Sequence, residues 1–181
     1  TPTYALHLAE VAKEQGYETS TSTIRCVLVA GEPGGSLEAV RQRISSVWGA
    51  DVLDHAGATE IGPWGVGWLE HSGLEVLEEW FHPEFLDIST GRPAKQGELA
   101  ELVLTTLGRH GCPVIRYRTG DVVHPVWPTE QEVAAGRSPR VWLKGGILGR
   151  TDDMFVIRGV NIFPSAVENI IREFPEVLEY R

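Results

Sequence analysis

The middle of the chain most constrains the fold, because its apolar segments are too short to form long helices. After Gly57, short segments rich in β-branched and aromatic residues alternate with Gly, Pro, Asp and Ser, which favour turns. This spacing is typical of a β-meander or a barrel-like sheet. We expect strands at 64–70, 74–78, 84–88, 98–106, 114–118 and 121–127.

The first third of the chain combines strands with helices. Residues 24–30 form a continuous β-rich run typical of a buried strand, and residues 51–54 predict a second, short strand. Between them, apolar residues recur at helical spacing from an expected N-cap at Ser36 to a stop at Gly49. These segments predict a parallel strand–helix–strand unit, preceded by an amphipathic helix over 3–15.

The last third predicts a polar surface loop over 128–140 and a strand over 141–148. The tail then predicts a strand, a turn over 159–164 and a helix whose Ser165 and Glu168 match a capping box. The fold class is therefore mixed α/β. It consists of a parallel αβ unit, a β-rich barrel-like region and the start of a small α+β C-terminal domain.

Composition excludes several classes of protein. The 181 residues carry 16 basic and 25 acidic side chains, a net charge of −9, which argues against a nucleic-acid binder. The apolar runs are far shorter than the roughly 20 residues that span a bilayer, so we expect no membrane segment. Two cysteines make no disulfide framework, and no secretory signal is present, so we expect a cytoplasmic protein.

Glycine gathers with charged and hydroxyl residues in four patches that follow expected strands. Loops at strand ends are where rigid sheets present functional groups. Each patch alone matches an ordinary turn, and none matches a phosphate-binding P-loop. The patches are AGEPGGS (30–36), DHAGATEIG (54–62), RYRTGD (116–121) and GRTDDMFVIRGVNIFPSAVE (149–168).

The order and spacing of these patches resemble the adenylate-forming superfamily, and within it the phenylacetate–CoA ligase branch. Residues Ala58, Thr59 and Glu60 resemble the end of the family's Tyr-Gly-x-Thr-Glu motif. Residues 117–121 resemble its Tyr-x-Thr-Gly-Asp motif. The stretch from Gly149 to Glu168 resembles the hinge and the opening of its C-terminal domain, so the resemblance covers nearly the whole chain.

The resemblance implies an enzyme that activates a carboxylic acid, expected to be aromatic, with ATP as an acyl-adenylate and passes the acyl group to coenzyme A. Attack of a carboxylate on the α-phosphate joins two anions, so the site must neutralise charge and align the reactants. The implied catalytic residues are Thr59, as a donor to the α-phosphate, Glu60, as a ligand of Mg²⁺, and Arg150. Asp121 is implied to accept the ribose hydroxyls, and Arg150 to reach ribose or phosphate oxygens. The implied pocket walls are Gly31, Glu32, Pro33, Asp54, His55, Ala56 and Gly57.

The resemblance also implies a domain division. Residues 1–149 would form the C-terminal part of the large N-terminal domain, and residues 150–181 the hinge and the start of the small domain. Asp152 would be the hinge residue, and Gly159 would line the coenzyme A tunnel. The family's phosphate loop and adenylation lysine have no counterpart here, so we expect the 181-residue chain alone to be inactive. We also expect exposed apolar surface to favour a homo-oligomer.

Several alternatives stay open from the residues alone. The Thr59–Glu60 pair and Asp121 also fit ordinary polar turns, and Arg116 and Arg118, taken to lie on one strand, fit surface salt bridges as well as phosphate contacts. Ala56 stands where the family has an adenine-stacking Tyr, so another aromatic must replace it.

The function also has alternatives. The acyl acceptor could be an amine or a carrier-protein thiol, or the chain could be a non-catalytic ligand-binding relative. A metal hydrolase built on His55, Glu60, His71 and His82 is a further alternative, although we expect no zinc because the family's cysteines are absent from this region.

Overall fold

The computed structural model describes residues 1–32, 34–69, 71–157, 160–162, 164, 167, 170–171 and 174. Its main element is an open eight-stranded sheet with the strand order β1-β2-β3-β4-β8-β7-β6-β5. Only the β1–β2 pair is parallel, and every other neighbouring pair is antiparallel. The expected mixed α/β class is confirmed, and the sheet does not close into a barrel because β1 and β5 remain its two edges.

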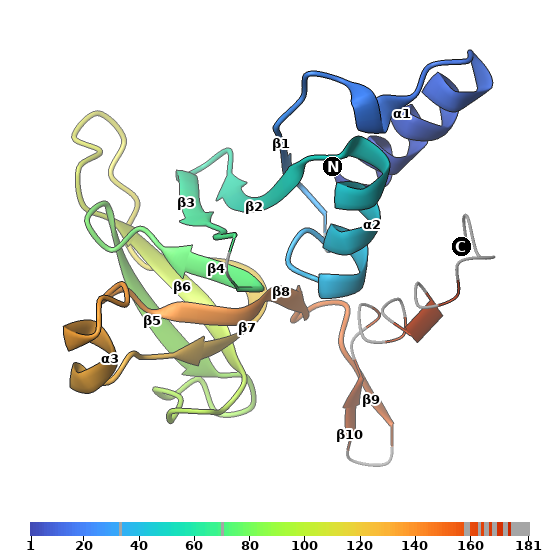
Figure 1. Ribbon diagram of the computed structural model, residues 1–181. Helices are drawn as coiled ribbons and strands as arrows, with labels where there is room; N and C mark the ends of the chain where they lie inside the picture. The colour runs from blue at the N-terminus through green and yellow to red at the C-terminus, as the bar shows by residue number, and fades with distance from the viewer. Residues whose placement is uncertain are drawn as a thin grey trace.

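The αβ unit lies at one end of the molecule in Figure 1, where two helices stand beside the first two strands. The strand–helix–strand order confirms the expected parallel unit, and Gly49 ends α2 in the left-handed conformation, as predicted. A small apolar core centred on Val29, Val40, Ile44 and Val52 joins helix and strands. The elements are α1 (Pro2–Glu14), the 3₁₀ turn η1 (Thr19–Thr21), β1 (Cys26–Ala30), α2 (Glu38–Trp48) and β2 (Asp51–Ala58).

Three expectations about this unit differ from the structure. Strand β1 is an edge strand on which only Val29 is buried, because nothing in the described structure covers its outer face. Ser36 is not the N-cap of α2, since the cap is Leu37 and the Ser36 hydroxyl is used elsewhere. Strand β2 also runs beyond the predicted 51–54 to Ala58.

The β-rich body contains the larger core. Its fully buried side chains include Trp64, Leu74, Leu102 and Leu143, contributed by four different strands. The strands are β3 (Gly62–Val66), β4 (Gly73–Val76), β5 (Phe81–Asp87), β6 (Ala100–Thr106), β7 (Tyr117–Val126) and β8 (Trp142–Arg150).

The body differs from expectation in two places. The separate strands predicted at 114–118 and 121–127 are largely one strand, β7, which bulges at two points and stays continuous. The expected loop over 128–140 contains a short helix, α3 (Glu130–Ala134). A complete capping box formed by Thr129 and Glu132 stabilises that helix, a signal that a polar-loop interpretation overlooks.

After β8, the chain forms a separate two-stranded antiparallel sheet from β9 (Phe155–Ile157) and β10 (Val160–Ile162). Strand β10 occupies part of the stretch predicted as a turn. The capping-box residues Ser165 and Glu168 lie outside the described residues. Within the described part of the chain, no helix has the length and apolar character needed to cross a membrane.

Candidate nucleotide site

The glycine-rich patches meet around one cavity of about 660 Å³. Of the described residues that the resemblance singles out, all line this cavity except Asp152. Pro33 and Gly159, expected in the pocket wall and in the coenzyme A tunnel, lie outside the described residues. The expected residues at the cavity are Gly31, Glu32, Asp54, His55, Ala56, Gly57, Thr59, Glu60, Asp121 and Arg150.

Strand pairing explains why segments distant in sequence come together. Ala30 pairs with His55 at the carboxyl end of the parallel β1–β2 pair, so the turn after β1 lies beside the end of β2. On the other side of the cavity, Asp121 pairs with Arg150 in the β7–β8 ladder. The parallel unit therefore supplies one wall and the antiparallel body the other.

The first wall is built around a buried polar pair. The hydroxyl of Ser36 donates to Oδ2 of Asp54, and the backbone N–H of His55 donates to Oδ1 at 2.9 Å. Burial raises the pKa of Asp54, and the hydrogen bond from Ser36 opposes that rise. A Cβ at Gly35 would lie 2.3 Å from Oδ1 of Asp54, so only glycine fits there. Each carboxylate oxygen keeps a further acceptor direction, so Asp54 can still meet a ligand.

The Thr59–Glu60 turn follows β2 and is exposed to the cavity. The guanidinium of Arg109 donates to the backbone carbonyl of Glu60 and ties the turn to the loop between β6 and β7. Burial, together with the negative charge of the nearby Glu60 carboxylate, raises the pKa of the Tyr117 phenol. Glu60 thus presents an accessible carboxylate at the mouth of the cavity.

The second wall carries the Asp121–Arg150 pair. Nη1 of Arg150 lies 3.5 Å from Oδ1 of Asp121 and donates to the carbonyl of Thr119 at 3.2 Å, while its Nε donates to Asp152 at 3.0 Å. Burial raises the pKa of Asp121 to about 6, although the Arg150 charge acts in the opposite direction. The hydrogen bond from Arg150 lowers the pKa of Asp152, which is exposed.

The two arginines near Asp121 form ion pairs within the protein. Arg118 makes a two-bonded pair with buried Glu101, and Nε of Arg116 lies 3.0 Å from Glu84. The expectation that both lie on one strand is wrong, because Arg116 precedes β7 and has a positive φ of 52°. These contacts favour surface salt bridges over phosphate contacts as the role of Arg116 and Arg118.

The sequence also left open a metal hydrolase built on His55, Glu60, His71 and His82. Among the described residues, no group of three or more His, Cys, Asp or Glu side chains could hold a metal ion. His71 stacks against Trp142, 5.3 Å between ring centroids. These observations give the metal-hydrolase alternative no support.

Some residues at the cavity were missed by reasoning from sequence. Tyr117 and Thr119 belong to the quoted Tyr-x-Thr-Gly-Asp motif, so the motif itself was the available signal. Ser36 was taken as a helix cap, and nothing local in the sequence indicates its bond to Asp54. Leu74 and Ile147, on β4 and β8, line the cavity through the sheet order, which no local pattern predicts.

Comparison with known sequences gives relatives of one kind. No family model matches the chain. A phenylacetate-coenzyme A ligase of Thermus thermophilus is 36% identical over 99% of this chain and 40% of its own length. The Escherichia coli phenylacetate-coenzyme A ligase is also 36% identical, over 96% of this chain and 38% of its own length. The chain therefore spans about 40% of the length of the curated relatives it matches.

Solved structures agree with this result. A 2-hydroxyisobutyryl-CoA ligase in complex with 2-HIB-AMP matches 97% of this chain and 37% of its own, with a TM-score of 0.86 and 33% identity. An open conformation of that ligase with 2-HIB-AMP and CoA matches the whole chain and 42% of its own, with a TM-score of 0.82. The fold is that of an adenylate-forming CoA ligase. Within that class, almost the whole chain resembles part of the phenylacetate-coenzyme A ligases.

Proposed function

We propose that this chain carries the nucleotide-binding wall of an ATP-dependent acid–CoA ligase of the phenylacetate type. The observation that carries the proposal is the convergence of Thr59, Glu60, Asp121 and Arg150 on one cavity. The relatives are phenylacetate-coenzyme A ligases, and a neighbouring structure is a CoA ligase in complex with 2-HIB-AMP. An aromatic carboxylic acid, ATP and coenzyme A are the proposed substrates.

Each proposed role follows from the chemistry of the side chain. Asp121 accepts hydrogen bonds from the ribose hydroxyls, because an ionised carboxylate is an acceptor on both oxygens. Arg150 keeps its charge at every working pH and faces the same space. Thr59 donates its hydroxyl to the α-phosphate, where a positioned donor offsets the charge that builds up as the carboxylate attacks phosphorus and pyrophosphate leaves.

The residues present fit a magnesium ion that accompanies ATP. Mg²⁺ is usually held by one or two carboxylates together with substrate phosphates and water. Glu60 is an exposed carboxylate at the cavity, close enough to Tyr117 for its charge to raise the pKa of that phenol. When bound, the ion would neutralise phosphate charge beside Thr59.

Tyr117 is proposed as the aromatic wall of the pocket, in place of the Tyr that the family has at Ala56. Ala56 belongs to the larger core cluster and lines the cavity, and its methyl group offers no ring on which adenine could stack. Tyr117 lines the same cavity from β7. The division into domains near residue 150, with Asp152 as the hinge, remains part of this proposal.

The test is ATP–pyrophosphate exchange by the full-length gene product with an aromatic acid such as phenylacetate. We expect Asp121→Ala and Glu60→Gln each to lower exchange at least tenfold, since each removes a charged partner of the nucleotide or its metal. Asp51→Asn, an exposed acid on β2 outside the cavity, is the matched control and should not change the rate. Unchanged exchange in Asp121→Ala would refute the ribose role.

Comparison of coenzyme A with an amine and a carrier-protein thiol in the second half-reaction identifies the acyl acceptor. Thioester formation only on coenzyme A is the expected result.

A further inference from the structure

The β6–β7 ladder is interrupted where Asp121 enters the cavity. Glu101 pairs with Val122 and Val103 pairs with Arg118, so the residues between them have no regular partner across the ladder. One residue of β6, Leu102, therefore faces three residues of β7, Thr119, Gly120 and Asp121. A bulge of this kind bends a strand and re-aims its side chains, and it leaves backbone groups without ladder hydrogen bonds.

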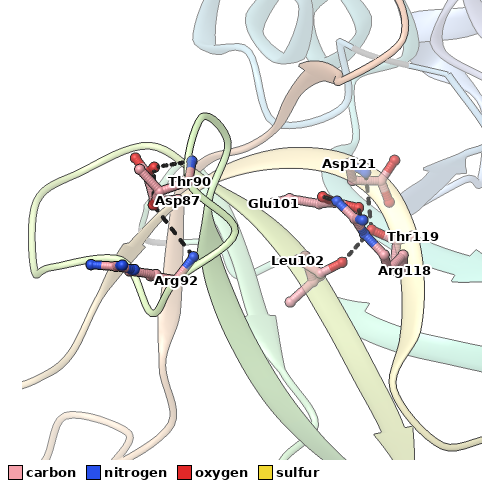
Figure 2. A network of polar contacts seen from close by, with 8 residues as sticks. All are labelled: Asp87, Thr90, Arg92, Glu101, Leu102, Arg118, Thr119 and Asp121. Carbon is pink, nitrogen blue, oxygen red and sulfur yellow. Dashed lines mark hydrogen bonds and ion pairs between the residues drawn. The ribbon is translucent and has the colours of Figure 1, made fainter.

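A single hydroxyl satisfies two of those backbone groups. Oγ1 of Thr119 donates to the carbonyl of Leu102 at 2.9 Å and accepts from the N–H of Asp121 at 3.0 Å. Figure 2 shows the Thr119 side chain between Leu102 and Asp121. Thr119 is only 8% exposed, so water cannot easily replace its hydroxyl in either bond.

The neighbours of Thr119 fix the same geometry. Its backbone carbonyl accepts from Arg150, which also contacts Asp121. On its other side, Arg118 is anchored to the buried Glu101 carboxylate by the pair seen in Figure 2. The bulge is thus held at both ends, and the Thr119 hydroxyl accepts directly from the Asp121 backbone N–H on the β6 side.

We infer that Thr119 is a positioning residue that aims the Asp121 carboxylate at the ribose hydroxyls of the bound nucleotide. The inference rests on the proposed function, in which Asp121 binds the ribose. Thr119 acts through Asp121: without the hydroxyl, the bulge relaxes and the carboxylate loses its alignment with the 2′- and 3′-hydroxyls. Valine has nearly the same shape as threonine and lacks the hydroxyl, whereas serine retains it.

The test compares the affinities of AMP and 2′-deoxy-AMP for the full-length gene product by calorimetry. Wild type should prefer AMP about tenfold, because 2′-deoxy-AMP lacks one hydrogen bond to a charged acceptor. Asp121→Asn and Thr119→Val should each reduce that preference to about twofold or less, and the double variant should reduce it no further. Thr119→Ser should restore the preference to within about twofold of wild type.

Val123→Ala is the stability-matched control, since Val123 is fully buried on the same strand and outside the cavity. Val123→Ala should lower the melting temperature and leave the AMP preference unchanged. If the role of Thr119 were merely structural, Thr119→Val would behave in the same way. If Thr119→Val does not fold, Thr119→Ala replaces it, and we expect the same loss of the AMP preference.

Two outcomes separate the inference from the proposed function. If Asp121→Asn loses the preference and both Thr119→Val and Thr119→Ala keep it, the positioning role is refuted and the ribose role stands. If wild type shows no preference, or Asp121→Asn binds AMP as wild type does, the ribose role and the Thr119 inference both fail.

Discussion

Gly120 illustrates how little space the site leaves for change at single residues. Its φ of +75° is a left-handed conformation, and a Cβ there would lie 2.7 Å from Nη2 of Arg150. The backbone conformation therefore favours glycine, and a Cβ there would also push the Arg150 guanidinium away. No such pressure acts on Gly136, which also has a positive φ but has open space around it.

We predict that Gly120→Ala weakens AMP binding by the full-length gene product about tenfold or more, because the methyl group displaces Arg150 from Asp121. The strained backbone should also cost about 1 kcal/mol or more of stability. Gly136→Ala, which meets only the backbone strain, is the matched control. Calorimetry and chemical denaturation measure the two effects, and equal AMP affinity in both variants would contradict the prediction.

The protonation of Asp121 gives the site a pH dependence in the acid range. Burial raises its folded-state pKa from 3.8 to about 6, against the opposing charge of Arg150, with Asp152 and Glu101 as further acidic neighbours that raise it. The folded protein thus binds a proton between about pH 4 and 6 that the unfolded chain has released. In that window stability falls as pH rises, so ionised Asp121 destabilises the empty site.

We predict that the affinity for adenosine rises as pH increases through about 6, because ionised Asp121 is the better acceptor for ribose hydroxyls. Adenosine is the ligand here because the phosphate of AMP itself ionises with a pKa of about 6. Asp121→Asn removes this step, and the affinity of that variant should be low and flat between pH 5 and 7. Calorimetric titrations across that range measure the effect in both proteins. A step of the same size in Asp121→Asn would assign the titration to another group.

At the scale of elements, Arg41 of α2 joins the helix to the sheet. Its guanidinium donates to the carbonyls of Val52, Trp68 and His71 at 3.0–3.2 Å. One side chain thus ties α2, β2 and the loop between β3 and β4. The helix is thereby fixed over the strands whose ends form the first wall of the cavity.

We predict that Arg41→Met lowers the free energy of unfolding by about 1–3 kcal/mol, because methionine keeps the aliphatic packing and leaves carbonyls without a charged donor. Arg43→Met on the same helix, for which the described structure gives no such bonds, should change stability by less than about 0.5 kcal/mol. Urea denaturation measures the free energy of unfolding of both variants. Equal losses in the two would show that the hydrogen bonds of Arg41 do not stabilise the fold.

Local patterns predicted the elements whose signals are local. The helical spacing of α1 and α2, the Gly49 stop and the parallel strand–helix–strand order all follow from periodicity and end signals. Patterns failed where a long-range partner decides. A serine before a helix is a common N-cap, so the local sequence favours that role for Ser36. In the folded chain its hydroxyl instead donates to Asp54, which is distant in sequence. The bulges of β7 likewise depend on the register of two neighbouring strands.

In the candidate site, too, some residues could be predicted from the sequence and others depended on long-range contacts. The resemblance to the ligase family implied that Thr59, Glu60, Asp121 and Arg150 share one site, and all four line the cavity. Their roles toward nucleotide and metal stay predictions. The contributions of Leu74 and Ile147 required the strand order, in which β8 lies between β4 and β7.

At the scale of the whole molecule, the open sheet leaves an apolar face at the β1 edge. Leu28 is 65% exposed on β1, and Tyr4 and Leu8 of α1 are exposed beside it. These side chains line a shallow hollow of about 350 Å³ that also includes Ile24 and Trp48. An exposed sheet edge with apolar neighbours favours association with another chain or segment.

We predict that the 181-residue chain, expressed as such, forms dimers or larger assemblies at micromolar concentration through this face. Leu28→Lys should shift the population toward monomer, since a charge on an edge strand opposes edge-to-edge pairing. Ile115→Lys, at a residue 75% exposed outside that hollow, is the matched control and should leave the assembly unchanged. Sedimentation velocity over a concentration series measures both, and a chain that stays monomeric throughout would mean that this face does not drive association.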